Sequence, residues 1–375
     1  MRASSLQFIR SASSLVINEC KKPNIFDDSN PSKANRDSLV EAGGDSYLVD
    51  KFLDEAGITK HRNIFGSMFA TILEMAGEEF DGGNLKITRA ALEEMADAFR
   101  MFRPYRERRK VTIFGSARIG QDHPSYHQAQ DLAGQIAQGG WMVVTGAGPG
   151  IMEAGMAGAG PENAIGVLIR LPFESANRFI ASDPKLVEMR YFFTRKLMLM
   201  KESHAFAVLP GGFGTMDETY EVMTLMQTGK SQPAPIVLID EPGGGYWDHW
   251  TKFVTEQLIG QGLVAPEDRS LFTITDDVNM AVQEIMNFYS NYHSCRWVGD
   301  LLVIRLTKVP SKAQLRELNE EYSAILASGE IRITDALPPE RASNDYVDLP
   351  RIAMRFDRKH YGRLREFIGS LNRLD

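Results

Sequence analysis

Three glycine-rich loops constrain the fold of this chain more than any other feature of its sequence. They read GSAR at 115–118, TGAGPGIM at 145–152 and PGGFGT at 210–215. Each loop follows a short apolar run that is typical of a buried strand, and each precedes a segment whose apolar residues have helical spacing. A strand, a glycine turn and a helix, repeated in this order, indicate a parallel sheet covered by helices.

The alternation of strands and helices extends over residues 110–291 and predicts an α/β fold. We expect a Rossmann-like, doubly wound parallel sheet, in which ligands bind outside the carboxyl ends of the strands, where the glycine loops lie. The expected strands are 111–114, 141–145, 164–170, 205–209 and 235–239, and the expected helices are 126–139, 183–201, 216–228, 247–261 and 278–291.

Segments of different texture flank this central domain. Residues 1–45 are rich in Ser, Asn, Asp and Pro and predict a poorly ordered terminus; the first part weakly resembles an organelle transit peptide, although an ordinary polar terminus fits better. Residues 46–109 predict a helical extension. Residues 292–375 predict a small α+β appendage with strands at 301–306, 330–334 and 352–356 and helices at 312–328 and 361–371.

Composition excludes several classes of protein. The formal net charge of −7 argues against a basic surface that binds nucleic acid. The apolar runs are far shorter than the roughly 20 residues that cross a bilayer, so we expect no membrane partner. The two cysteines, Cys20 and Cys295, cannot build a disulfide framework or a four-cysteine zinc site, and the cytoplasm is the expected compartment.

The glycine loops are suited to hold phosphate. Glycine lets the main chain approach an anion, and the first N–H groups of the following helix carry partial positive charge. The loop at 115–120 lacks the G-x-G-x-x-G pattern of dinucleotide sites, and in 146–151 the third glycine comes one position early. Neither contains the Gly-Lys-Ser/Thr of a P-loop. Hydride transfer and ATP hydrolysis are therefore disfavoured.

Charged residues near the third loop indicate what the phosphate belongs to. Asp217 and Glu218 follow the loop and are expected in the first turn of a helix, where acids also simply favour the helix dipole. Arg195 and Lys196 interrupt the apolar stretch before it, where an arginine is costly unless it is paired or holds a ligand. A buried structural ion pair would explain Arg195; a phosphate-bearing sugar between Arg and Glu fits better.

At residues 111–240 the chain resembles the LOG (lonely guy) family of cytokinin riboside 5′-monophosphate phosphoribohydrolases and nucleotide 5′-monophosphate nucleosidases, whose members are often labelled lysine decarboxylase-like. The resemblance rests on the pattern PGGxGTxxE, present from Pro210 to Glu218, and on the upstream Arg195-Lys196 pair. It implies hydrolysis of the N-glycosidic bond of a nucleoside 5′-monophosphate to free base and ribose 5-phosphate.

The resemblance also implies site residues. Arg195 and Glu218 correspond to the catalytic pair of the family. The residues expected to bind substrate are Ser116, Thr145, Gly146, Gly148, Gly150, Met152, Lys196, Gly211, Gly212, Gly214 and Thr215. We expect no cofactor and no metal, because the seven histidines form no ligand motif and no lysine stands out as an anchor for pyridoxal phosphate. Decarboxylation is disfavoured for the same reason.

Two other roles remain open at the level of sequence. One is a non-catalytic nucleotide-binding sensor or carrier, against which the presence of both Arg195 and Glu218 argues. The other is a structural role, in which the terminal segments help to build an oligomer. We expect a homo-oligomer, at least a dimer, because the segments around Arg195 and Glu218 are rich in Met and Phe. The residues concerned are Met189, Phe192, Phe193, Met198, Met200, Met223 and Met226.

Overall fold

A computed structural model describes residues 45–78, 80–172 and 176–374. The poorly ordered segment expected before residue 45, with the stretch that weakly resembles a transit peptide, therefore lies outside the described residues. The chain divides into two compact units, one ending at Asp97 and the other beginning at Ala98. No helix of the described part is long and apolar enough to cross a membrane.

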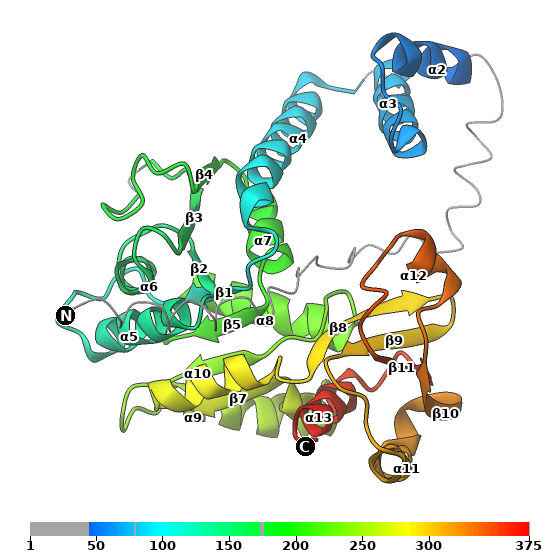
Figure 1. Cartoon of the computed structure of the whole chain (residues 1–375). Coiled ribbons are helices and arrows are strands. Elements are labelled where there is room, and N and C mark those ends of the chain that lie inside the picture. Colours follow the sequence, from blue (N-terminus) through cyan, green and yellow to red (C-terminus); the bar gives the residue numbers. More distant parts are fainter. Residues whose placement is uncertain (1–44, 79, 173–175, 375) are drawn as a thin grey trace, which may run out of the picture. The chain divides into compact units, whose positions relative to one another are not determined.

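The larger unit is built on a seven-stranded parallel sheet with helices packed against it (Figure 1). The strand order is β4-β3-β2-β1-β5-β6-β7, so the chain starts in the middle of the sheet, runs to one edge and then crosses to the other. The strands are β1 Lys110–Phe114, β2 Met142–Thr145, β3 Ala164–Ile169, β4 Leu186–Met189, β5 Ala205–Val208, β6 Ile236–Ile239 and β7 Phe272–Thr275. The Rossmann-like α/β fold that the sequence predicts is thus confirmed.

The main core lies between this sheet and three helices whose apolar residues have helical spacing. Helices α5, α6 and α10 bury small residues and aliphatic side chains against the strands and against one another. The helices of this domain are α5 Pro124–Gln138, α6 Ile151–Ala159, α7 Phe192–Lys201, α8 Phe213–Gln227, α9 Tyr246–Phe253 and α10 Val278–Asn287, with a π-helical turn η3 Val254–Ile259 and a 3-10 helix η4 Pro266–Leu271.

The helix expected over 183–201 is wrong in its first half. Residues Leu186–Met189 form β4, the edge strand that pairs with β3, and α7 begins only at Phe192. Val187 and Met189 are buried while Glu188 between them is exposed, which is the alternation of a strand with one covered face. Four residues are too few for this period to stand out from the helical pattern that follows.

The C-terminal appendage is a four-stranded antiparallel sheet with its own core. The strand order is β10-β11-β9-β8. The elements are β8 Tyr292–Val298, β9 Leu301–Leu306, α11 Lys312–Glu321, η5 Ser323–Ile325, β10 Leu326–Thr334, α12 Pro338–Ala342, β11 Arg351–Phe356 and α13 Tyr361–Asn372. Strand β8 was not expected, and the helix expected over 312–328 ends at Glu321, because Leu326 already pairs with Phe356 of the sheet.

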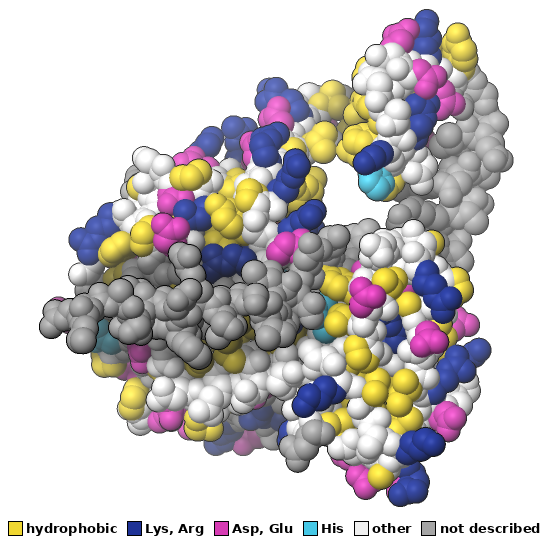
Figure 2. Space-filling model, viewed as in Figure 1, with side chains coloured by type: hydrophobic (Ala, Val, Ile, Leu, Met, Phe, Trp, Pro, Cys, Tyr) yellow, Lys and Arg dark blue, Asp and Glu magenta, His cyan; other side chains and the backbone are white. Residues whose placement is uncertain are grey.

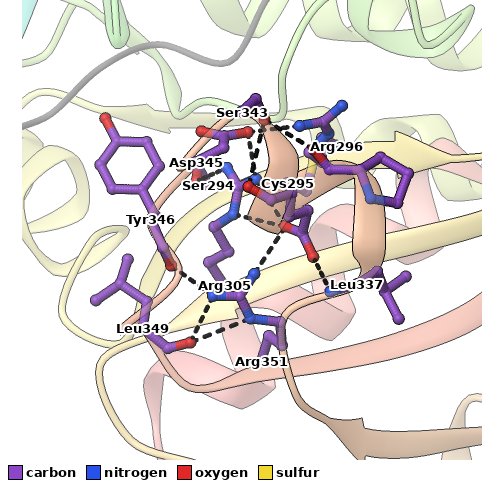
Figure 3. A network of polar contacts seen from close by, with 12 residues as sticks. Ser294, Cys295, Arg296, Arg305, Leu337, Ser343, Asp345, Tyr346, Leu349 and Arg351 are labelled. Carbon is purple, nitrogen blue, oxygen red and sulfur yellow. Dashed lines mark hydrogen bonds and ion pairs between the residues drawn. The ribbon is translucent and has the colours of Figure 1, made fainter.

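A buried cluster of charges fixes the loop that contains α12 to the appendage sheet (Figure 3). Arg305 is fully buried on β9, and its guanidinium lies 2.8 Å from Glu340 and 2.7 Å from Asp345. Arg351 of β11 lies 2.8 Å from the same oxygen of Glu340. Removing one partner of such a pair would leave a buried charge uncompensated, which typically costs about 3–5 kcal/mol. The arginines of this segment thus include structural residues.

The smaller unit is helical. It contains α2 Asp45–Glu55 and α3 Arg62–Gly77, and α4 Gly82–Phe102 leads from it into the 3-10 turn η2 Arg103–Tyr105. Within it, Val49 and Leu53 are buried and the rings of Phe52 and Phe69 meet at 4.5 Å. Figure 2 shows many hydrophobic side chains on the surface of α2 and α3. The exposed ones include Tyr47, Leu48, Ile64, Phe65, Met68, Ile72 and Leu73.

Candidate active site

The three glycine loops meet at the carboxyl ends of β1, β2 and β5 and are hydrogen-bonded to one another. The amide of Ser116, after β1, donates to the carbonyl of Pro210, after β5, at 3.1 Å. The carbonyl of Ser116 in turn accepts from the amide of Ile151, the first residue of α6, at 3.0 Å. Loops that lie far apart in the sequence thus form one continuous floor.

A cavity of about 860 Å³ opens above this floor. It has the size of a site for a nucleotide-sized ligand. Nine of the residues expected from the sequence line it, namely Ser116, Gly146, Met152, Arg195, Gly211, Gly212, Gly214, Thr215 and Glu218. Four others do not line it, namely Thr145, Gly148, Gly150 and Lys196.

Three of those four hold the second loop in shape. Thr145 is buried and its hydroxyl accepts from the amide of Ala147 at 3.1 Å. The carbonyl of Gly148 accepts from the side-chain amide of Asn177 at 3.0 Å. Gly150 has φ +68°, and a Cβ there would lie 2.3 Å from the carbonyl oxygen of Ser116. Glycine at this position therefore allows the contact between the first and second loops.

Arg195 reaches the cavity from α7 and lies beside Glu218. Its Nη1 is 3.6 Å from Oε1 of Glu218, and the two side chains are only 10% and 9% exposed. Its Nε donates to the carbonyl of Val167 in β3 at 3.0 Å, which fixes the guanidinium plane. The pair that the sequence predicts is therefore brought together in a largely water-excluded position.

The sequence predicts Glu218 in the first turn of its helix, but the structure does not place it there. Helix α8 begins at Phe213, so Asp217 and Glu218 fall in the second turn. The helix dipole acts mainly within the first turn and explains these acids less well there. Burial raises the pKa of Glu218, and the neighbouring charge of Arg195 opposes this rise without cancelling it. A perturbed carboxyl group in a cavity is a feature of functional sites.

Lys196 has a different role from Arg195. Its Nζ lies 2.9 Å from Asp217 and 2.6 Å from Glu221, so it ties α7 to α8 outside the cavity. Burial alone would lower the pKa of Lys196, but the hydrogen bonds with Glu221 and Asp217 raise it above its ordinary value. A lysine that forms a Schiff base needs a lowered pKa instead.

The cavity also contains residues that sequence reasoning did not assign to the site. The hydroxyl of Tyr246 in α9 donates a hydrogen bond to the carbonyl of Gly211 at 2.7 Å and so supports the third loop. Phe192 and Phe213 are the first residues of α7 and α8, and Phe213 is 96% exposed at the cavity. The Tyr-Trp pair after a run of glycines at 243–245 is the only sequence signal that marked this loop.

Metal ligands form no cluster in the part of the chain that the structure describes. No group of three or more His, Cys, Asp and Glu side chains is placed there to hold a metal ion.

The fold and the cavity together define a class of protein. A Rossmann-like sheet has its glycine loops joined at the carboxyl edge, two helix N-termini without side-chain caps follow them, and a buried arginine-carboxylate pair closes one side. This arrangement is typical of α/β proteins that bind phosphorylated ligands.

Comparison with known proteins narrows the class to a family. Residues 146–285 match the family model described as "Possible lysine decarboxylase". A probable cytokinin riboside 5′-monophosphate phosphoribohydrolase of Oryza sativa is 32% identical over 95 residues, which cover 25% of this chain and 40% of the rice protein. A cytokinin riboside 5′-monophosphate phosphoribohydrolase of Arabidopsis thaliana is 23% identical over 187 residues, which cover 48% of this chain and 83% of that protein.

Among solved structures, the molybdenum cofactor carrier protein of Chlamydomonas reinhardtii matches with 20% identity and a TM-score of 0.35, over 48% of this chain and 96% of that one. The sequence comparisons confirm the resemblance of the α/β domain to the LOG family.

Proposed function

We propose that this protein hydrolyses the N-glycosidic bond of a nucleoside 5′-monophosphate and releases the free base and ribose 5-phosphate. The observation that carries the proposal is the buried pair of Arg195 and Glu218 beside a floor of glycine loops. The names of the rice and Arabidopsis relatives support the same class of reaction.

The phosphate is held by the third loop and the start of α8. Gly212 caps α8 without a side-chain hydrogen bond, so the first backbone N–H groups of the helix remain available to an anion. No side chain projects from this surface at Gly211, Gly212 or Gly214, so a phosphate can approach the backbone. The hydroxyl of Thr215 adds a hydrogen-bond donor. Helix α6, which is also uncapped, and the backbone around Ser116 close the other side.

Glu218 acts on the ribose. Cleavage of the glycosidic bond passes through a state in which positive charge develops at C1′ and the ring oxygen, and a carboxylate nearby stabilises that charge. In a largely water-excluded position this stabilisation is stronger than it would be in water. The same carboxylate accepts a proton from the water molecule whose oxygen bonds to C1′ as the C1′–N bond breaks, and the departing base takes up that proton. Arg195 lowers the pKa of Glu218 against the effect of burial, orients the carboxylate and provides a positive charge toward the phosphate.

The base contacts the apolar part of the cavity. Met152, Ile169, Leu171, Phe192 and Phe213 line that part, and aromatic side chains stack on any nucleobase. An apolar wall also suits a base with a hydrophobic substituent. We therefore propose nucleoside 5′-monophosphates as the substrate class, with cytokinin riboside monophosphates among its members because the relatives are named for them.

Release of the free base tests this function directly. The purified full chain is incubated separately with AMP, GMP, CMP, UMP and isopentenyladenosine monophosphate, and free base is measured by chromatography. Adenosine serves as the matched control, because it presents the same glycosidic bond without the phosphate. We expect base from at least one monophosphate and far less from adenosine. Binding of the nucleotides without release of any base would instead indicate a sensor or carrier.

A further inference from the structure

A second cavity, of about 470 Å³, lies where the α/β domain meets the C-terminal appendage. Strand β7 at the edge of the large sheet lines it from one side, and helix α13 of the appendage lines it from the other. It shares no lining residue with the cavity above the glycine loops. Figure 1 shows α13 on the β7 side of the large sheet, where it packs against η4.

Three arginines from both parts of the molecule line this cavity. Arg269 comes from η4, Arg365 comes from α13, and Arg373 directly follows α13. Two carboxylates face them, but each already has a partner. Glu284 pairs with Arg365, and Glu366 pairs with Arg363, which lies outside the cavity. The lining therefore carries an excess of positive charge.

Arg365 is the most enclosed of the three. Its side chain is 14% exposed, and its Nε is buried with no hydrogen-bond partner among the described residues. Buried donors without a partner are rare in proteins and call for a specific explanation, such as a ligand. Burial lowers the pKa of Arg365; the nearby charge of Arg373 acts in the same direction, and that of Glu284 opposes it.

Two of the arginines flank a position without a side chain. A Cβ on Gly369 would lie 3.3 Å from Nη1 of Arg373 and 3.6 Å from Nη1 of Arg365. The guanidinium groups thus lie close together despite their like charge. Close cations in a cavity repel one another, and an anion between them would relieve that repulsion.

The edge of the sheet supplies a further kind of donor. Strand β7 is the last strand of its sheet and pairs only with β6 among the described strands. Phe272, Thr273 and Ile274 of this edge strand line the cavity. N–H groups at a sheet edge have no neighbouring strand to which they can donate, so they can bind an anion instead.

We propose that this cavity binds a small molecule that carries a diphosphate group. Guanidinium groups donate paired hydrogen bonds to phosphate oxygens, and several of them around one cavity suit a ligand with more than one phosphate. The volume is within the range of small-molecule sites. Because Arg269 and Arg373 belong to different parts of the chain, the ligand would bridge η4 and α13. The proposal is independent of the nucleosidase activity proposed above.

Isothermal titration of the full chain with inorganic pyrophosphate tests the proposal. The informative variant combines Arg269→Ala and Arg373→Ala, two exposed residues whose loss should leave the fold intact. Lys359→Ala is the matched control, since it removes one exposed positive charge just before the same helix and outside the cavity, without unpairing a carboxylate of the lining. We expect saturable binding by the wild type and the control, and at least tenfold weaker binding at this site in the double variant.

Either of two results would overturn the proposal. One is a wild type that shows no saturable binding, and the other is a double variant that binds pyrophosphate as the wild type does, which would assign the anion to the glycine-loop cavity. If the double variant unfolds at a lower temperature without ligand, Arg373→Ala alone replaces it. Titration with ADP identifies the source of the diphosphate, because tighter binding that disappears in the double variant indicates a nucleoside diphosphate.

Discussion

The guanidinium of Arg195 occupies the space where a side chain on Gly146 would stand. A Cβ built on Gly146 would lie 1.9 Å from Nη2 of Arg195, so the glycine of the second loop and the arginine of α7 depend on each other. The next nearest atom to this Cβ is the sulfur of Met152, at 2.7 Å. The second loop therefore positions Arg195, the arginine that we propose to be catalytic, in addition to forming the floor of the cavity.

Gly146→Ala should displace Arg195 from Glu218 and reduce turnover on the order of tenfold or more, because an electrostatic contact is weakened without being removed. The fold should persist, since the flexible end of the arginine can move. Gly120→Ala is the control, because a Cβ there meets no atom within 4 Å. Equal kcat values for the two variants would show that the position of Arg195 does not matter to the reaction.

The raised pKa of Glu218 predicts a pH dependence of activity. If the ionised carboxylate is the active form, the acidic limb of the kcat/KM profile, which reports the free enzyme, should lie at a higher pH than 4.5, the ordinary value for glutamate. Arg195 lowers the pKa against the effect of burial, so Arg195→Ala should shift the limb further toward neutral pH. A limb at or below the ordinary value would contradict the role of burial.

The same shift affects stability. Because the pKa of Glu218 is raised in the folded state, its contribution to the free energy of unfolding is fully present below the unfolded-state value and is lost as pH rises through the folded-state value. Glu218→Gln does not titrate. Denaturant unfolding of both proteins across this pH range should show the wild type losing stability relative to the variant as pH increases.

Nucleosidase activity should not require a metal ion. The proposed mechanism uses a carboxylate, a guanidinium and backbone amides, and each of these acts without a divalent cation. Prolonged treatment with EDTA should leave the rate of base release unchanged. If activity is lost and one divalent ion restores it, the assignment of the chemistry to these groups alone is wrong.

We predict that the protein forms at least a dimer, although not through all the residues that first suggested it. Met189, Met198 and Met226 are buried in the subunit, whereas Phe192 and Phe193 are about half exposed. Exposed aromatic side chains are typical of interfaces. Light scattering at micromolar concentration should give at least twice the subunit mass of 41.9 kDa, and a monomeric mass would refute the prediction.

Features that depend on residues adjacent in the chain could be predicted from the sequence. Strand, glycine and helix follow one another in the chain, so the sheet and the loops could be predicted. The pairing of Arg195 with Glu218 was implied by the resemblance to the LOG family. Strand β4 could not be predicted, since its four residues are defined by pairing with β3 rather than by their own period. Tyr246 and the cavity of Arg365 were also beyond reach, because their partners lie 35 and 81 residues away.

Turnover of Glu218→Gln, measured together with nucleotide binding, tests the central claim most directly. The amide is nearly isosteric with the carboxylate but cannot stabilise the charge at C1′, so we expect kcat to fall on the order of a hundredfold or more, about 3 kcal/mol, while nucleotide binding persists. Glu221→Gln, on the same helix but paired with Lys196 outside the cavity, should retain most of its activity. Near wild-type turnover by Glu218→Gln on the best nucleotide would contradict the account and make Asp217, which lines the same cavity, the next candidate.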